Sequence, residues 1–284
     1  MFSPIANTTF NYIMTMNSFR DSVPTDHRPS WIKITTITMV SSALKNIDIH
    51  KIRDIFQKLQ TIRIRMKNSK HSGFEWCLKD TTFYNQVTLN YKDEYSTKSI
   101  KLFPNGSIQV AGCSDLFDCN RVIKQLSFIL KVTLGNTDDI PIDSFRIVMI
   151  NSNFSLNYHV NLIEISNHFG KESVFNVSFD PDRYSAVKIK FKPASDMKQV
   201  TVSIFSTGKI IVTGAETLKE IVFAYNIINQ HIIGHITKIK VMTSENKDTF
   251  ENILGYNIHE FLPFLKSKGF KPWVMAPQNY KINF

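Results

Sequence analysis

Apolar and polar residues alternate along two matching stretches of the chain, Ser99–Gly112 and Thr201–Gly214. The two stretches align without gaps at an offset of 102 residues and carry the same residue types in the same order. Each predicts two strands joined by a tight turn, in which Gly106 or Gly208 supplies the positive φ that such a turn requires. The matched positions are Phe103 with Phe205, Gly106 with Gly208, Ile108 with Ile210, Val110 with Val212, and Gly112 with Gly214.

The segments around the two hairpins repeat the same order of elements. A strand precedes each hairpin, an amphipathic helix follows it, and a further strand and helix lie upstream. Two unrelated α+β domains with similar hairpins would not explain this shared order, so the pattern indicates an internal repeat. The first repeat has Trp31–Val40, 47–59, Tyr84–Tyr91, the hairpin and 116–132, and the second has Ser144–Asn153, 158–168, Tyr184–Phe191, the hairpin and 216–232.

This organisation predicts an α+β fold in which two pseudo-symmetric repeats, 31–136 and 140–242, form one curved antiparallel β-sheet with helices on its convex face. Residues 1–30 are rich in Asn, Thr and Ser without a sustained period, which predicts a mobile N-terminal arm. Residues 243–284 carry many aromatic side chains, so we expect this C-terminal extension to pack on the body.

Side-chain parity separates the two faces of the predicted sheet. One parity of the hairpin strands is entirely aliphatic and is predicted to lie under the helices. The opposite parity mixes small polar groups, lysines and one Phe per repeat, has no acid, and is joined by Tyr84 and Tyr184 from the preceding strands. A ring-bearing face without carboxylates suits phosphates and base edges. The aliphatic set is Ile100, Leu102, Ile108 and Val110, with Val202, Ile204, Ile210 and Val212.

Composition agrees with a polyanionic partner. The formal net charge is +10 and the sequence pI is about 9.4, which favours nucleic acid or an acidic surface. Cys77, Cys113 and Cys119 are an odd set without a Cys-x-x-Cys spacing, so neither a disulfide framework nor a zinc knuckle is expected. No apolar stretch reaches the ~18–20 residues that a membrane span needs, and no signal peptide is visible.

The candidates for chemistry are weak. His231 and His235 stand four apart near a helix end, but two His without a third ligand make a poor metal site, so no metal or cofactor is predicted. Cys113 and Cys119 are interpreted as plain buried thiols. Neither a Gly-rich phosphate loop, nor a nucleophile elbow, nor a paired-carboxylate constellation occurs, which argues against an enzyme.

The second hairpin, Ile204–Ala215 with the letters IFSTGKIIVTGA, resembles the corresponding hairpin of the TATA-binding protein family. The first, Leu102–Cys113, departs more, because it lacks the Lys after the Gly and the Thr before the later Gly. The segment Asp180–Tyr184 is similar to the family's stirrup loop. The divergence and the Asn-, Ile- and Lys-rich composition look most like the homologues of large DNA viruses.

The resemblance implies a saddle-shaped fold and a set of site residues. Aromatic side chains that pry apart base steps would be Tyr84, Phe103, Tyr184 and Phe205. Minor-groove contacts would come from Met149, Asn151, Ile211, Thr213, Gln109 and Ala111, with Thr36 or Thr38 at the matching point of the first repeat. Phosphates would meet Lys101, Lys188, Lys190 and Lys209, and a partner factor would meet Asp180 and Asp182, which a plain turn explains equally well. Neutral Asn90 and Ser107 predict a weaker first half.

The function implied is a transcription initiation factor that binds and bends A/T-rich promoter DNA through the minor groove. It would recruit a TFIIB-like factor and RNA polymerase, without a membrane partner, inside the cell in a viral factory, in a virion or alternatively in the nucleus. Whether it forms a homodimer without DNA stays open. The first alternative is a protein-binding scaffold of the same fold with impaired DNA binding. A second is a nucleic-acid-positioning domain, against which the lack of a recognisable catalytic domain argues.

Overall fold

The chain divides into two compact units, Met1–Lys240 and Val241–Phe284, and the first unit holds both repeats. In the second unit, β12 (Asn252–Ile253) pairs antiparallel with β13 (Tyr256–Asn257). Most of the C-terminal extension lies outside the described residues, so its packing on the body stays a prediction. The computed structural model describes residues 15–43, 45–64, 73–80, 83–93, 96–241, 252–253, 256–257 and 267–269.

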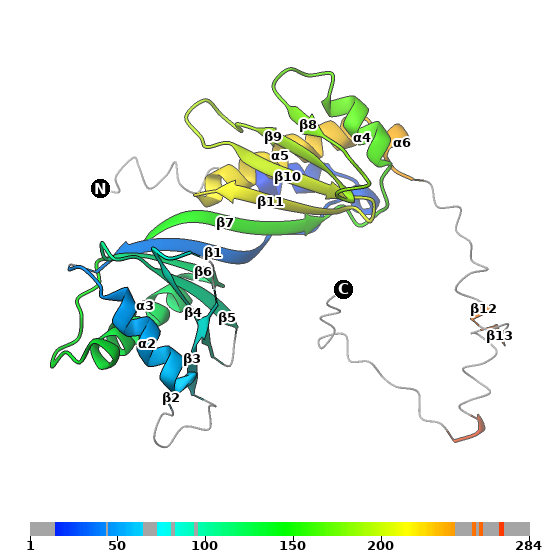
Figure 1. Ribbon diagram of the computed structural model, residues 1–284. Coiled ribbons are helices and arrows are strands. Elements are labelled where there is room, and N and C mark those ends of the chain that lie inside the picture. The colour runs from blue at the N-terminus through cyan, green and yellow to red at the C-terminus, as the bar shows by residue number, and fades with distance from the viewer. Residues whose placement is uncertain are drawn as a thin grey trace, which may run out of the picture. The chain divides into compact units, whose positions relative to one another are not determined.

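One eleven-stranded antiparallel sheet runs through the first unit (Figure 1), and the two repeats meet where β1 pairs with β7. The strand order is β2-β3-β4-β5-β6-β1-β7-β11-β10-β9-β8. The first half comprises β1 (Lys33–Ser42), β2 (Thr61–Ile64), β3 (Phe74–Lys79), β4 (Val87–Lys92), β5 (Thr97–Leu102) and β6 (Ser107–Cys113). The second half comprises β7 (Arg146–Ser155), β8 (Asn176–Ser178), β9 (Ala186–Phe191), β10 (Val200–Phe205) and β11 (Lys209–Ala215).

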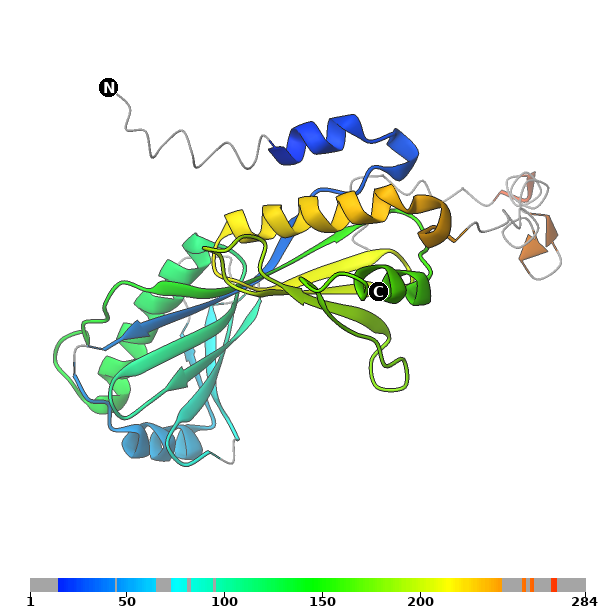
Figure 2. The same ribbon diagram turned by 90° about the horizontal axis from the view of Figure 1, so that it is seen from above.

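Helices cover one side of each half (Figures 1 and 2). The first half carries α2 (Ile49–Leu59) and α3 (Leu116–Leu134), and the second carries α4 (Leu162–Phe169), α5 (Leu218–Gly234) and the short α6 (Ile236–Ile239). Side-chain caps begin four of these helices: Asp48 caps α2, Asp115 caps α3, Asn161 caps α4, and Thr217 with Glu220 forms a capping box on α5. Among the described residues, no helix combines the length and apolar character that a bilayer crossing requires.

Both hydrophobic cores lie on the same face of the sheet. Ile37 and Ile150 stand directly opposite each other across β1 and β7, so their side chains point to the same side. Ile37 belongs to the core of the first half and Ile150 to the core of the second. Ile34 and Ile147 pack against both cores and join them. The parity prediction is confirmed, since all eight aliphatic residues assigned to the covered face are at most 1% exposed.

The structure contains strands that the hydrophobic pattern did not predict. β2, β3 and β8 are edge or near-edge strands of three to six residues, too short to give a clear alternation. The β2–β3 excursion also lengthens the first repeat, because Ile37 and Ile150 are 113 positions apart whereas the hairpins are 102 apart. The helix predicted over 158–168 begins later, at Leu162, where the Asn161 side chain accepts two backbone N–H bonds.

Residues 15–30 pack against the second half, although the whole of 1–30 was expected to be a mobile arm. Residues 15–22 are helical, and Met16 is buried in the second core. The Phe19 ring meets the edge of Tyr225 at 6.3 Å, and the Tyr225 hydroxyl donates to the Ser30 carbonyl over 3.1 Å. The reason is burial of apolar groups that are spaced too sparsely to show a period. Residues 1–14 lie outside the described part of the chain.

A buried ionic network distinguishes the first half. Lys98 is 1% exposed, and its Nζ lies 3.0 Å from Asp93 Oδ2 and 2.9 Å from Asp118 Oδ1. Arg121 Nη2 lies 2.9 Å from Asp93 Oδ2 and also pairs with Asp118. The network ties the start of β5 to the first turn of α3. At the position 102 residues later, the second half has the buried apolar Val200.

Replacing Lys98 by Met should lower the free energy of unfolding by about 3–5 kcal/mol, because two buried carboxylates lose a counter-charge. Chemical denaturation of the full chain measures this. The matched control is Lys219→Met, whose Nζ lies 3.9 Å from an exposed Asp196 carboxylate and should cost about 0–1 kcal/mol. Equal losses in the two variants would show that the network does not stabilise the fold.

Candidate nucleic-acid interface

The uncovered side of the sheet, here called the concave face, is formed by side chains that point away from both cores. Two cross-strand rows of directly paired residues traverse it. The row of the first half is Lys79, Thr88, Lys101, Gln109, Val40 and Arg146, and the row of the second half is Ser178, Lys188, Ser203, Ile211, Asn153 and Lys33. Each row ends on a strand of the other repeat, so the two halves share the centre.

The strands give the two halves of the concave face the same net charge of +4, from five cations and Glu75 in the first half and from four cations in the second. The weaker first half inferred from Asn90 and Ser107 stays a prediction for DNA binding, although other strands supply cations to this half. Lys33 and Arg146 are 113 positions apart and occupy equivalent places in the two repeats. An alignment made at the 102-residue offset of the hairpins does not match them. The cations of the first half are Arg63, Lys79, Lys92, Lys101 and Arg146, and those of the second are Lys33, Lys188, Lys190 and Lys209.

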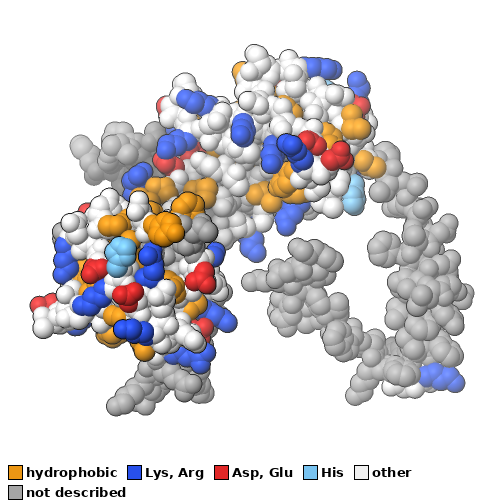
Figure 3. Space-filling model, in the orientation of Figure 1, with side chains coloured by type: hydrophobic (Ala, Val, Ile, Leu, Met, Phe, Trp, Pro, Cys, Tyr) orange, Lys and Arg blue, Asp and Glu red, His pale blue; other side chains and the backbone are white. Residues whose placement is uncertain are grey.

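Carboxylates are almost absent from the sheet. Among the described strands, Glu75 in β3 is the single acidic residue. It lies on the concave face opposite Lys92, and its Oε2 is 2.9 Å from Arg63 Nε on the neighbouring strand β2. Its charge is thus offset locally. On the face seen in Figure 3, Lys and Arg side chains are spread over both halves rather than gathered in one dense patch.

The centre of the concave face is neutral and polar. Thr36 pairs with Asn151, and Thr38 pairs with Met149, on either side of the Ile37–Ile150 point. The pseudo-symmetry therefore equates Thr38 with Asn151 and Thr36 with Met149. Asn151 Nδ2 donates to Thr36 Oγ1 over 3.0 Å, while the buried Asn151 Oδ1 has no hydrogen-bond partner within the described residues. The positions of Nδ2 and Oδ1 in the Asn151 amide are assigned from this hydrogen bond.

Half-buried side chains flank this centre on both sides. Gln109 and Ala111 on β6 occupy the same places as Ile211 and Thr213 on β11. The Thr213 hydroxyl donates to the Thr201 carbonyl over 3.4 Å. The floor of the concave face is thus made of uncharged groups, and the short side chains of Ala111 and Thr213 allow another molecule to approach the sheet closely there.

Aromatic side chains stand at the outer end of the second half. The rings of Tyr184 and Phe205 meet at 5.8 Å and 64°, so each supports the other. Lys188 Nζ lies 4.0 Å from the centroid of the Tyr184 ring. Tyr184 is 38% exposed and Phe205 is half-buried. The structure therefore brings together the two aromatics predicted for this end with one of the predicted lysines.

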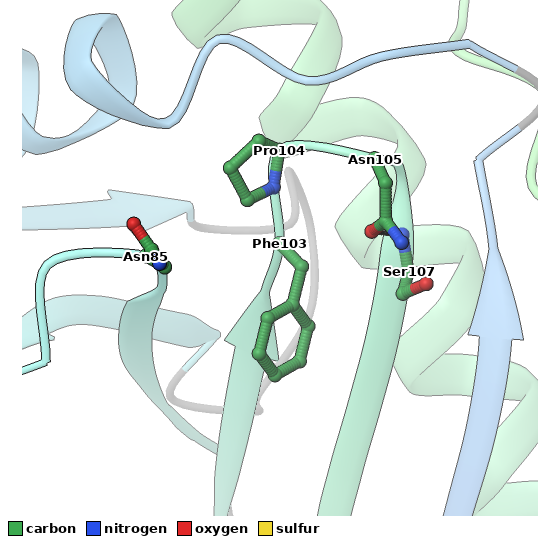
Figure 4. A pocket seen from close by; sticks show the side chains of 5 residues that line it. All are labelled: Asn85, Phe103, Pro104, Asn105 and Ser107. Atoms are coloured by element: carbon green, nitrogen blue, oxygen red, sulfur yellow. Dashed lines mark hydrogen bonds between the residues drawn. The ribbon is translucent and has the colours of Figure 1, made fainter.

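The first half has its aromatics at the matching end, but in a more open arrangement. Figure 4 shows the Phe103 ring below the β5–β6 turn, in a shallow hollow with a volume of about 540 Å³. Tyr84 is 85% exposed and does not line this hollow. Its carbonyl accepts a hydrogen bond from Arg53 Nη2 on α2 over 3.3 Å. The hollow is lined by Asn85, Phe103, Pro104, Asn105 and Ser107.

The hairpin turns hold Phe103 and Phe205 in place. At Gly208 φ is +78°, and a Cβ would lie 2.1 Å from the Tyr158 carbonyl oxygen. The Gly208 carbonyl in turn accepts from Leu156 N over 2.9 Å. The first hairpin is clamped in the same way, because Ala43 N donates to the Gly106 carbonyl over 2.8 Å. The sequence match between these glycines thus reflects close backbone approach as well as turn geometry.

The predicted partner residues Asp180 and Asp182 lie in an exposed turn directly before β9. Tyr184 N donates to the Asp180 carbonyl over 2.9 Å, and the Asp180 carboxylate lies 3.6 Å from Arg183 Nε. The turn therefore positions Tyr184 for the aromatic pair. Both carboxylates stay exposed to solvent.

The chain is similar in sequence and in structure to known proteins. Residues 144–233, which include β7 to β11 and most of α5, match the family described as transcription factor TFIID, or TATA-binding protein. The chain is 30% identical over 249 residues to the "TATA-box-binding protein-like" protein of Acanthamoeba polyphaga mimivirus, and the match covers 74% of this chain and 67% of that protein. It is 27% identical over 143 residues to the TATA-box-binding protein of Methanothrix thermoacetophila, with 49% and 73% covered. The solved structure of Methanococcus jannaschii TBP is similar with a TM-score of 0.48, at 17% identity over 72% of this chain and 99% of that chain.

Proposed function

The chain belongs to the TATA-binding protein family, and from this premise we propose that it is a transcription initiation factor that binds A·T-rich duplex DNA through the minor groove. The observation that carries this proposal is the concave face, whose strands hold nine cations and one acid, with the same net charge on both halves. A surface used only for solvation would mix both charges. The same surface argues against a purely protein-binding scaffold.

Phosphate contact is the first step of the proposed binding. The cations stand around a neutral centre, so they can reach both strands of a duplex laid along the sheet. Each Lys or Arg that neutralises a phosphate releases counterions and steepens the dependence of log affinity on log salt by about 0.9. The equal net charge of the two halves makes the two ends of the site comparable in strength.

Base contact is the second step. The minor groove displays acceptors at every pair and distinguishes A·T from G·C chiefly through the guanine amino group. The small floor residues Ala111 and Thr213, with the amide of Asn151, offer close approach without charge. We therefore assign A·T preference to exclusion of the guanine amino group and to groove shape.

Deformation is the third step. Aromatic wedges at both ends would unstack base steps and bend the duplex, at a cost of about 1–10 kcal/mol that is lowest at flexible TA steps. Two of the four aromatics are Tyr, and a Tyr hydroxyl is unfavourable between stacked bases without a partner. We therefore expect shallower insertion and a smaller bend than four Phe would produce.

Protein partners would bind surfaces that remain free when DNA occupies the concave face. We assign a TFIIB-like factor to the exposed Asp180–Asp182 turn, next to the DNA end that Tyr184 would contact. The polymerase machinery would follow through that factor or through the convex helices. On this proposal the chain acts by assembly and not as an enzyme.

Binding to A·T-rich and G·C-rich duplexes of equal length across a salt series tests the central claim. We expect tighter binding to the A·T-rich duplex at every salt concentration, with a slope set by the phosphate contacts. Fluorescence anisotropy with the full chain measures both quantities. Equal affinity for the two duplexes throughout the series would instead support the scaffold.

The balance between the halves is tested by Lys101→Ala and Lys190→Ala. Each should reduce the salt slope by about 0.9, because each removes one phosphate contact. Lys219→Ala on α5 is the control and should leave the slope unchanged. A loss for Lys190→Ala alone would show that the first half does not contact DNA.

The wedge assignment is tested by Phe205→Ala. The variant should keep its fold, since the ring is half-buried at the end of a strand, but it should abolish bending of an end-labelled duplex measured by energy transfer. The control Phe128→Ala, which removes an exposed ring from α3, should bend DNA normally. Thermal unfolding of both variants and of the parent chain shows whether each is folded. Persistent bending by Phe205→Ala would contradict the wedge.

A further inference from the structure

Metal-ligating side chains gather between α4 and α5, on the helix side of the second half and away from the concave face. His168 is in the last turn of α4, Glu172 follows that helix, and His231 and His235 stand at the end of α5. The sequence presented His231 and His235 without a third ligand. The tertiary structure supplies His168 and Glu172 from a segment some sixty residues earlier.

The donor atoms converge at distances that suit one tetrahedral ion. His168 Nε2 lies 3.2 Å from His231 Nδ1, and His231 Nδ1 lies 3.4 Å from Glu172 Oε1. All three donor atoms lie within 4.8 Å of one another. Zinc bonds of 2.0–2.1 Å to nitrogen place two ligand atoms of a tetrahedral site about 3.3 Å apart, so two of the three distances between donor atoms already fit. The third distance joins Glu172 to His168, and the Glu172 side chain, which is 42% exposed, can rotate to shorten it.

Proton counting favours a cation at this point. A neutral imidazole nitrogen either donates or accepts, and an ionised carboxylate only accepts. His231 Nδ1 faces both His168 Nε2 and Glu172 Oε1, so a single hydrogen on it has to be shared between two acceptors. If His168 donates to His231 Nδ1, two lone pairs face each other across the 3.4 Å gap to Glu172. A divalent ion would satisfy every lone pair at once.

The surrounding aromatic side chains hold the ligands in place. The rings of Phe169 and Phe175 each lie 5.2 Å from the His231 ring and form an apolar wall. His235 stacks on His168 at 3.9 Å, and its Nδ1 lies 3.3 Å from the His231 carbonyl.

We propose that His168, Glu172 and His231 bind one Zn²⁺, with the fourth position open to water. Two His and one Glu are a ligand set that zinc accepts with an open position. His168 and Glu172 also line a hollow with a volume of about 340 Å³, through which water reaches the site. Glu164, Lys171 and Lys238 line the same hollow, so its charged groups nearly balance before the ion binds.

The ion would connect α4 to α5 across the second core. An ion that binds the folded chain but not the unfolded chain stabilises the fold, and the effect grows with ion concentration. Zinc should therefore raise the melting temperature of the full chain without DNA. This proposal is independent of the concave face, and its test does not depend on DNA binding.

Calorimetric titration of chelator-treated full chain with Zn²⁺ tests the site. We expect one ion per chain, and Co²⁺ in its place should show the intense visible absorption of a tetrahedral complex. His168→Asn, His231→Asn and Glu172→Gln should each weaken binding by about tenfold or more. His50→Asn, which changes an exposed histidine on α2, should bind as tightly as the parent chain.

Melting curves recorded without metal show whether each variant is folded. Glu172→Gln keeps the size of a half-exposed side chain, so it should melt with the parent chain while losing zinc affinity. Failure of the parent chain to bind zinc stoichiometrically would overturn the proposal. So would unchanged affinity in Glu172→Gln and His168→Asn, or a loss in His50→Asn of the same size.

Discussion

The pairing of β1 with β7 is the interaction on which the rest of the molecule depends. It places Ile37 opposite Ile150 and so forces the cores of both repeats onto one face of a continuous sheet. Ile34 and Ile147 seal the junction by packing against both cores. Because α2, α3, α4 and α5 all lie on that face, none of these helices covers the opposite face of the sheet. A binding surface follows directly from where the apolar residues are buried.

The same pairing also sets the chemistry of the concave face. Each repeat sends its first strand next to the other, so Lys33 completes the row of the second half and Arg146 the row of the first. The charges of the two halves become comparable although the repeats differ in sequence. The hairpin clamps at Gly106 and Gly208 then hold an aromatic side chain at each outer end. The two halves of the face are therefore similar in charge and in the position of one Phe side chain, although their sequences differ.

The helix sides of the two halves differ in how they are stabilised. The first half stabilises the start of α3 with the buried network around Lys98, while the second half uses a capping box at Glu220 over the apolar Val200. The second half alone, within the described residues, gathers a histidine cluster between its helices. Residues 15–30 also pack on the second half, and no other part of the chain that the structure describes packs on the first half in this way. These differences lie on the helix side of the sheet, away from the concave face.

Local sequence determined the repeat, its strands and hairpins, the covered parity and the aromatic ends, because period-two alternation and turn glycines act over a few residues. It also carried the family resemblance, which the relatives confirm. Tertiary structure alone decided the short edge strands, the equivalence of Thr38 with Asn151, the cations Lys33, Lys79, Lys92 and Arg146 on the concave face, and the meeting of His168 and Glu172 with His231. These depend on pairing register and helix packing between segments far apart in the chain, and neither is visible in the local pattern of apolar and polar residues.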